Sequence, residues 1–210
     1  RIAPACVIGD AERSNRLSPG NGHACLSRTD FVAAAEAAAE AATGEEKEGE
    51  GIAVQIFTSG TTAAPKAALL RHSNLLSYIL GTVEFASASD DEAALVCVPP
   101  YHIAGIAALL SSIYATRRIA LLPSFDPDSW LALAGSERAT NAFVVPTMLA
   151  RIIARMDEGA SADLSALQAI AYGGGRMPLE LIDRALELFP QTNFPNAYGL
   201  TETSSTIALL

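Results

Sequence analysis

The sequence predicts an α/β fold with a mostly parallel sheet flanked by helices. From Ile52 onward, short apolar runs typical of strands alternate with longer runs that carry helix-start signals. Two of the short runs, 93–98 and 142–145, are apolar at every position, as expected for strands that helices cover on both faces. In such sheets the functional residues collect at the carboxyl ends of the strands.

The expected elements follow one another in regular order. Strands are predicted at 52–57, 94–98, 118–122, 141–145 and 168–172, with a short extended run at 192–194. Helices are predicted at 73–85, 103–115, 126–133, 146–156 and 178–189. Ser73 and Asp126 are of the type that caps a helix, and Pro178 suits a first helical turn.

Residues 1–51 are interpreted as a lead-in segment and residues 52–210 as the α/β core. The lead-in segment contains one helix, expected from Phe31 to Ala42 after a cap at Thr29 or Asp30. A strand is expected at 5–8, and 45–51 form a charged, glycine-broken linker.

The composition disfavours several classes of protein. The 210 residues are 50% hydrophobic, no apolar run is long enough to cross a bilayer, and no secretory signal is visible. A net charge of −9 disfavours nucleic-acid and anionic-membrane partners, although local N–H groups and one lysine can still bind a nucleotide. The three cysteines and three histidines are scattered without metal-ligand spacing, which favours a cytoplasmic protein without a zinc site.

Polar or glycine-rich corners follow four of the predicted strands. A hydroxyl-rich loop follows Phe57, Pro99–His102 follows Val98, a glycine triplet follows Tyr172, and residues 197–202 follow the last extended run. Because parallel strands present their carboxyl ends at one edge of a sheet, these corners are expected to converge there.

The loop after Phe57 favours an anionic ligand. Its small polar groups and backbone N–H groups suit phosphate oxygens, and a lysine adds positive charge. The residues concerned are Thr58, Ser59, Gly60, Thr61, Thr62 and Lys66. The loop is not a P-loop, because Pro65 stands where that motif has glycine. A hydroxyl-rich surface turn carries equal weight as an interpretation of this loop alone.

Two further corners can contact a flat ligand. Gly173, Gly174 and Gly175 let the backbone approach such a ligand closely, or make an ordinary tight turn from strand to helix. Residues 198–202 place an aromatic ring, a hydroxyl and a carboxylate within five positions, which suits a base, a phosphate oxygen and Mg²⁺. The alternative for this second motif is a turn with a core tyrosine and a solvated glutamate.

His102 precedes an apolar helix and could lie near the polar head group of a ligand with an uncharged tail. Taken alone, a packed loop histidine is the favoured interpretation. No nucleophile–base pair stands out, because Gly-x-Ser-x-Gly does not occur and Ser204–Ser205 has no associated histidine. Hydrolase chemistry is therefore poorly supported.

Together these motifs resemble those of the adenylate-forming enzymes, which include acyl-CoA synthetases, aryl-CoA ligases, luciferases and adenylation domains. Residues 58–67 look like the phosphate loop of that superfamily, 173–179 like its adenine-flanking glycine turn, and 198–202 match its Tyr-Gly-x-Thr-Glu signature. Pro100–His102 is similar to the loop that closes the acyl pocket in the CoA-ligase branch. The resemblance implies the central part of a large N-terminal domain, from a longer enzyme whose C-terminal domain is absent here.

The resemblance also implies a two-step reaction with small-molecule partners. ATP and a carboxylic acid form an acyl-adenylate and pyrophosphate with the help of Mg²⁺, and AMP leaves in the second step. The acyl group then passes to the thiol of coenzyme A or of a carrier phosphopantetheine. The resemblance leaves the acid and a homodimer open, and implies that these 210 residues alone are inactive.

The resemblance assigns a role to each matching position. The phosphate-loop residues named above, with Lys66 as a catalytic cation, would hold the β- and γ-phosphates. Gly173, Gly174 and Gly175 would line the adenine, Tyr198 would stack on it, and Gly199 would belong to the same nucleotide site. Thr201 would bind the α-phosphate, the catalytic Glu202 the metal, and the catalytic His102 would lie beside the reacting carboxylate.

Two alanines depart from the pattern of the superfamily. Ala63 and Ala67 stand where glycine is usual, and an alanine forced to positive φ would be strained by roughly 1 kcal/mol or more. Such strain would leave an enzyme that only forms the thioester from a supplied acyl-adenylate, or a non-catalytic nucleotide-binding module. Both alternatives stay open at this point.

Overall fold

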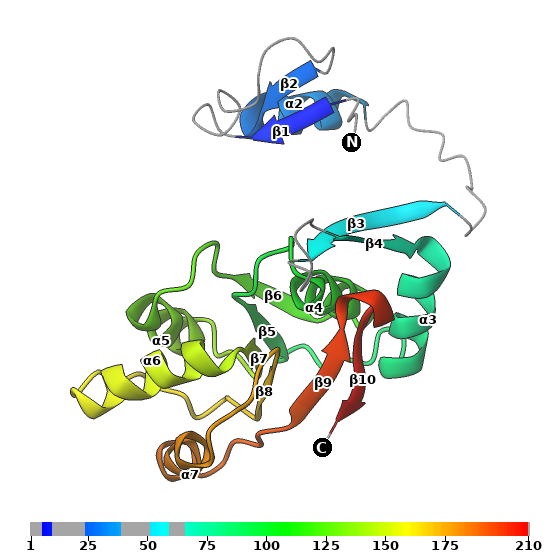
Figure 1. Cartoon of the computed structure of the whole chain (residues 1–210). Coiled ribbons are helices and arrows are strands. Elements are labelled where there is room, and N and C mark those ends of the chain that lie inside the picture. Colours follow the sequence, from blue (N-terminus) through cyan, green and yellow to red (C-terminus); the bar gives the residue numbers. More distant parts are fainter. Residues whose placement is uncertain (1–5, 10–23, 39–50, 59–65, 210) are drawn as a thin grey trace. The chain divides into compact units, whose positions relative to one another are not determined.

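The computed structural model describes residues 6–9, 24–38, 51–58 and 66–209, and the chain divides into compact units at 1–47 and 48–210 (Figure 1). In the first unit, strand β1 (Cys6–Gly9) pairs in parallel with β2 (Ala24–Ser27), and helix α2 (Arg28–Ala38) follows. The Ser27 hydroxyl accepts a hydrogen bond from the Asp30 backbone N–H at 3.0 Å. The helix therefore begins three residues earlier than predicted, and the predicted cap at Thr29 or Asp30 is wrong because both residues lie inside it. The predicted end of the helix and residues 45–50 of the charged linker lie outside the described residues.

The second unit is built on a six-stranded sheet with the strand order β10-β9-β8-β7-β5-β6. Its strands are β5 (Ala93–Val96), β6 (Arg118–Leu121), β7 (Asn141–Val144), β8 (Ala169–Gly173), β9 (Asn196–Leu200) and β10 (Ser205–Leu209). All neighbouring pairs are parallel except β9 and β10, which run antiparallel, with β10 as the outermost strand. The predicted α/β class with a mostly parallel sheet is confirmed.

Five helices accompany this sheet. They are α3 (His72–Thr82), α4 (Ile103–Tyr114), α5 (Pro127–Ser136), α6 (Pro146–Asp157) and α7 (Leu179–Leu188). The chain leaves β5 toward β6 and then returns past β5 to β7, so right-handed crossovers require α4 on one face and α5 on the other. Helices α5, α6 and α7 lie side by side on one face, and α4 contacts α3 and β10 on the other (Figure 1). No helix in the described ranges is both long and apolar enough to span a bilayer.

The core lies mainly between the sheet and helices α5 to α7. Trp130, Leu149, Ile152 and Ile170 are fully buried there, and Cys97 lies in the same cluster. Asp126 caps α5 by accepting a hydrogen bond from the Ser129 backbone N–H at 2.9 Å. The predicted cap at that residue is therefore confirmed.

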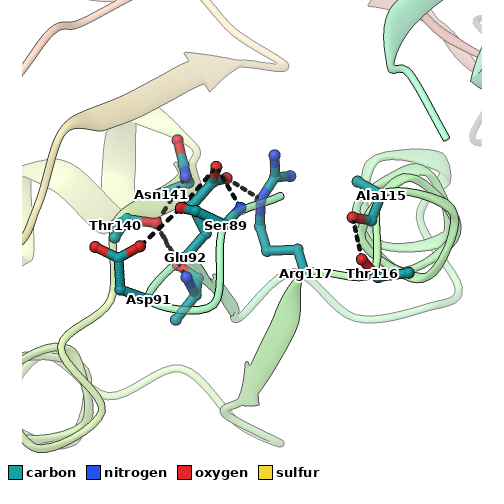
Figure 2. A network of polar contacts seen from close by, with 9 residues as sticks. Ser89, Asp91, Glu92, Ala115, Thr116, Arg117, Thr140 and Asn141 are labelled. Atoms are coloured by element: carbon teal, nitrogen blue, oxygen red, sulfur yellow. Dashed lines mark hydrogen bonds and ion pairs between the residues drawn. The ribbon is translucent and has the colours of Figure 1, made fainter. Parts of the chain in front are cut away.

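The amino-terminal edge of the sheet is closed by hydrogen bonds between the segments that precede the strands. The buried Thr140 hydroxyl accepts from the Ala93 N–H at 3.0 Å and from the Asn141 side-chain amide at 2.8 Å. The Arg117 guanidinium donates to Glu92 at 2.8 Å, so the turn before β5 is tied to the start of β6 (Figure 2). These hydrogen bonds connect neighbouring strands at the positions where the strands begin.

A separate antiparallel hairpin consists of β3 (Ile52–Thr58) and β4 (Lys66–Arg71). The predicted strand at 52–57 is present as β3, whereas β4 was not predicted. The loop that joins these strands, 59–65, lies outside the described residues. Val54, Ile56, Ala68 and Leu70 share one face of the hairpin by register, and three of them are buried.

Two predicted positions were wrong. The extended run at 192–194 contributes only one isolated bridge, Asn193 to Ala169, and the strand is β9, which includes the Tyr198 motif. Ser73 is not the cap of α3, because the helix begins at His72 and Arg71 occupies the cap position. Most other strands and helices in the core agree with their predicted ranges within one or two residues.

Candidate functional site

The carboxyl edge of the sheet brings together the corners that follow its strands. Strand β5 leads to Pro99–His102, β7 to Val145, β8 to the glycine turn, and β9 to the 3₁₀ turn η1 (Thr201–Thr203). The strand order reverses between β5 and β7, and their helices α4 and α6 lie on opposite faces. An open α/β sheet binds ligands outside the carboxyl ends at such a reversal.

The glycine turn is required in part by the fold itself. A Cβ atom at Gly173 would collide with the carbonyl oxygen of Ala197 in β9, so a side chain there would separate β8 from β9. Gly174 has φ +76°, a conformation that glycine adopts at low cost. Gly173 and Gly174 are therefore both required by the backbone, as predicted for a tight turn from strand to helix. Gly175 is exposed and has only Pro146 side-chain atoms within 4 Å of an added Cβ.

The aromatic–acid motif spans the end of β9 and the turn after it. Tyr198 is 58% exposed, so the alternative of a core tyrosine is wrong. A Cβ at Gly199 would collide with the Ser205 carbonyl oxygen, because β10 passes close to this residue. Thr201 is half-buried and Glu202 is exposed at the tip of the turn. Tyr198 thus lies within β9, whereas Thr201 and Glu202 lie in the turn that follows this strand.

His102 occupies the cap position of α4 and is exposed. Its backbone N–H donates to the Pro99 carbonyl oxygen at 3.0 Å, and its ring lies 4.8 Å from the Tyr101 ring, centroid to centroid. Gly105 allows the first turn of α4 to press on this loop, since a Cβ there would collide with the Pro99 oxygen. The loop backbone is fixed while both rings face outward.

The β3–β4 hairpin carries both ends of the hydroxyl-rich loop, and its second strand contacts the turn between β9 and β10. Thr58 and Lys66 are register partners at the end of β3 and the start of β4. Strand β4 contacts η1, which carries Thr201 and Glu202 (Figure 1). The loop residues between these strands, Ser59, Gly60, Thr61, Thr62 and Ala63, lie outside the described residues.

Ala67, unlike Ala63, lies in the described part of the chain. It pairs with Phe57 inside the β3–β4 ladder and is not among the described residues with positive φ. An alanine in extended backbone carries no left-handed strain. The strain considered for this position is therefore absent.

The buried cysteine of the core, Cys97, is poorly reactive. Burial raises the pKa of the Cys97 thiol to about 11, so the thiolate is scarce at neutral pH. Within the described residues, no group of three His, Cys, Asp or Glu side chains is placed to hold a metal ion. A single exposed carboxylate such as Glu202 would suit a magnesium ion whose other ligands are phosphate oxygens and water.

These features define a class: an α/β protein with a mostly parallel sheet, a separate β-hairpin and a candidate ligand site at the carboxyl ends of the strands. The family model described as AMP-binding enzyme matches residues 7–210, and the chain belongs to this family.

Curated relatives are CoA ligases. The chain is 32% identical over 157 residues to 2-succinylbenzoate–CoA ligase from Bacillus cytotoxicus, covering 74% of this chain and 31% of that protein. It is 33% identical over 160 residues to feruloyl-CoA synthase from Amycolatopsis sp., covering 76% and 32%. The chain thus spans about a third of the length of these relatives.

Two solved structures share the fold of this chain. The N-terminal domain of FACL13 from Mycobacterium tuberculosis, in an inhibitor-bound crystal structure, superposes with a TM-score of 0.80 at 24% identity. That match covers 99% of this chain and 54% of the other. O-succinylbenzoate coenzyme A synthetase from Bacillus subtilis in complex with AMP gives a TM-score of 0.74 at 22% identity, covering 98% and 51%.

One residue of the carboxyl edge was missed by sequence reasoning. Thr203 follows Glu202 directly, and its hydroxyl makes hydrogen bonds within the β9–β10 turn. A threonine in a polar run carries no distinguishing signal in the sequence. Its partners become visible only when β10 folds back on β9.

Proposed function

We propose that this chain supplies the nucleotide- and acid-binding face of an ATP-dependent acyl-CoA synthetase. The contact between β4, which begins at Lys66, and η1, which carries Thr201 and Glu202, is the observation that supports this proposal most strongly. The two contacting elements contain a cation, a hydroxyl and a carboxylate, which supports their acting together on one ligand. The names of the relatives, which are CoA ligases, support the same class of reaction.

Each residue at this edge has a role that its position and chemistry suit. Lys66 and the hydroxyl-rich loop neutralise the phosphates of ATP, whose negative charge otherwise repels the attacking carboxylate. Tyr198 offers an exposed ring face for the adenine base. The Thr201 hydroxyl donates a hydrogen bond to a phosphate oxygen.

The acid enters near His102, which follows β5 and caps α4. An imidazole at this point orients the carboxylate toward the phosphate that it attacks. Helix α4 carries no charged residue from Ile103 to Tyr114, so it offers an uncharged wall for the acyl chain. Coenzyme A or a carrier phosphopantetheine is the acceptor.

Magnesium, when bound with ATP, shields the phosphate charge and withdraws electrons from the reacting phosphorus. Glu202 is the residue of this chain that would hold the metal. The proposed catalysis rests on positioning and charge neutralisation, which explains why no nucleophilic side chain is needed.

The proposal is tested by ATP–pyrophosphate exchange on the full-length protein with a panel of aliphatic and aromatic acids. At least one acid should stimulate exchange, and Lys66→Met should reduce it strongly. Arg118→Met is the matched control, because it removes a cation at the amino-terminal edge of the same sheet. Absence of both exchange and ATP-dependent thioester with every acid would overturn the proposal.

Two results would instead point to the alternatives. Thioester formed only from a supplied acyl-adenylate would identify an enzyme of the second half-reaction. Calorimetry that detects neither ATP·Mg²⁺ nor AMP would identify a module that keeps the fold without the chemistry.

A further inference from the structure

The turn between β9 and β10 is organised around a single hydroxyl. Thr203 Oγ1 accepts a hydrogen bond from the Leu200 backbone N–H at 3.0 Å. It also lies 2.9 Å from the Leu200 carbonyl oxygen and 3.0 Å from the Ser205 carbonyl oxygen, to which its proton can be donated. The hydroxyl thus joins the last residue of β9 to the first residue of β10.

The backbone of this turn is strained. Ser204 has φ 61° and ψ 28°, and Ser205 has φ 106°, although neither residue is glycine. Such conformations persist only where surrounding contacts hold them, and they are common at functional sites. Ser204 and Ser205 are both buried, so their strained backbone is enclosed by the protein.

A second feature of the turn affects the position of the Ser205 carbonyl group. Gly199 has no side chain, which leaves room for the Ser205 oxygen that the Thr203 hydroxyl also contacts. Two positions around one carbonyl therefore determine how tightly the chain reverses. Thr201 and Glu202 lie at the tip of this reversal, between Leu200 and Thr203.

We propose that Thr203 is a positioning residue whose hydroxyl holds the turn that presents Thr201 and Glu202 to a magnesium–nucleotide complex. The inference rests on the proposed function. Loss of the hydroxyl leaves the Leu200 N–H and the Ser205 oxygen without this partner, so the strained residues relax and the carboxylate of Glu202 moves. Outer-shell groups of this kind typically change metal affinity or activity by 10–100-fold.

The test compares four variants of the full-length protein. Thr203→Val and Thr203→Ala both remove the hydroxyl, with and without a branched side chain. Thr203→Ser keeps it. Thr192→Val is the matched control, because it removes a buried hydroxyl that donates to the Leu167 oxygen at 2.9 Å before β9, far along the strand from the turn.

Two measurements report on the proposal. Amide hydrogen exchange at Leu200 should become faster in Thr203→Val and Thr203→Ala and stay unchanged in the serine and control variants. The ratio of ATP affinities measured with Mg²⁺ and with a chelator should fall about 10-fold in the same two variants. That ratio should not change in Thr192→Val, even if its unfolding midpoint falls.

The outcomes separate the two proposals. If the wild-type protein binds Mg·ATP and both hydroxyl-free variants keep its affinity ratio, the positioning role is overturned while the proposed function stands. Unchanged Leu200 exchange in those variants would overturn it as well. If the wild-type protein binds no ATP in either condition, the proposed function fails and the positioning role fails with it.

Discussion

The two edges of the central sheet are built in opposite ways. At the amino-terminal edge, polar side chains are paired: the buried Thr140 hydroxyl accepts from the Ala93 N–H, and the half-buried Arg117 donates to Glu92. At the carboxyl edge, Tyr198, the motif carboxylate and the histidine before α4 are exposed. One edge uses its polar groups to join strands, and the other leaves them available to a ligand.

This difference shows how one sheet can separate stability from function. Paired, buried polar groups are costly to remove, so changes at the amino-terminal edge should act on the free energy of unfolding. Exposed groups at the carboxyl edge contribute little to folding, so changes there should act on ligand binding. The β9–β10 turn is the exception, because strained backbone and ligand-facing residues coincide in it.

The largest effect is expected from Glu202→Gln, which keeps the size of the side chain and removes its charge. The rate of ATP–pyrophosphate exchange should fall about 100-fold, because one of the groups that organises charge around the phosphates is lost. The thermal unfolding midpoint should not change, since the side chain is exposed. A large fall in that midpoint would contradict the view that the carboxyl edge contributes to ligand binding and not to stability.

The opposite result is expected from Thr140→Val. The Ala93 N–H and the Asn141 amide lose their acceptor, which should lower the free energy of unfolding by about 1–3 kcal/mol. Chemical denaturation measures this directly, with Thr140→Ser as the control that restores the hydroxyl. An unchanged stability would mean that the amino-terminal edge is not fastened in this way.

A smaller effect is expected from Ala67→Gly in the hairpin. Because Ala67 already lies in extended backbone, glycine should lower stability by roughly 0.5–1 kcal/mol and should not raise pyrophosphate exchange. Any gain from restoring glycine should come from Ala63 alone. An increase in exchange for the single Ala67→Gly variant would contradict the position of this residue in β4.

The smallest effect is expected at Glu92. The hydrogen bond from Arg117 holds the pKa of this carboxyl below its usual range, so its stabilising contribution is present above that range and is lost as the pH falls through the lowered pKa. Wild-type stability should therefore decline more steeply under acid than that of Glu92→Gln. Parallel acid-unfolding curves would show that the pair contributes nothing, as solvent partly reaches both side chains.

The sequence predicted most of the core elements, because their signals are local. The apolar run at 93–98 and the cap at Asp126 depend on residues next to one another in the chain. It missed β4, whose Lys-Ala-Ala-Leu-Leu-Arg sequence consists mainly of helix-favouring residues and becomes a strand by pairing with β3. It placed a strand at 192–194 instead of β9, because Asn196 and Gly199 are poor strand formers until β8 and β10 supply hydrogen bonds.

The sequence by itself therefore determined the α/β class and the order in which the polar corners follow the strands. The family match agrees with the motifs that carried the resemblance. Only the tertiary structure decided that β4 lies against η1, that Ala67 is unstrained and that Thr203 closes the β9–β10 turn. Each of these depends on hydrogen bonds or contacts between segments that fold together, and local residue preference does not specify such partners.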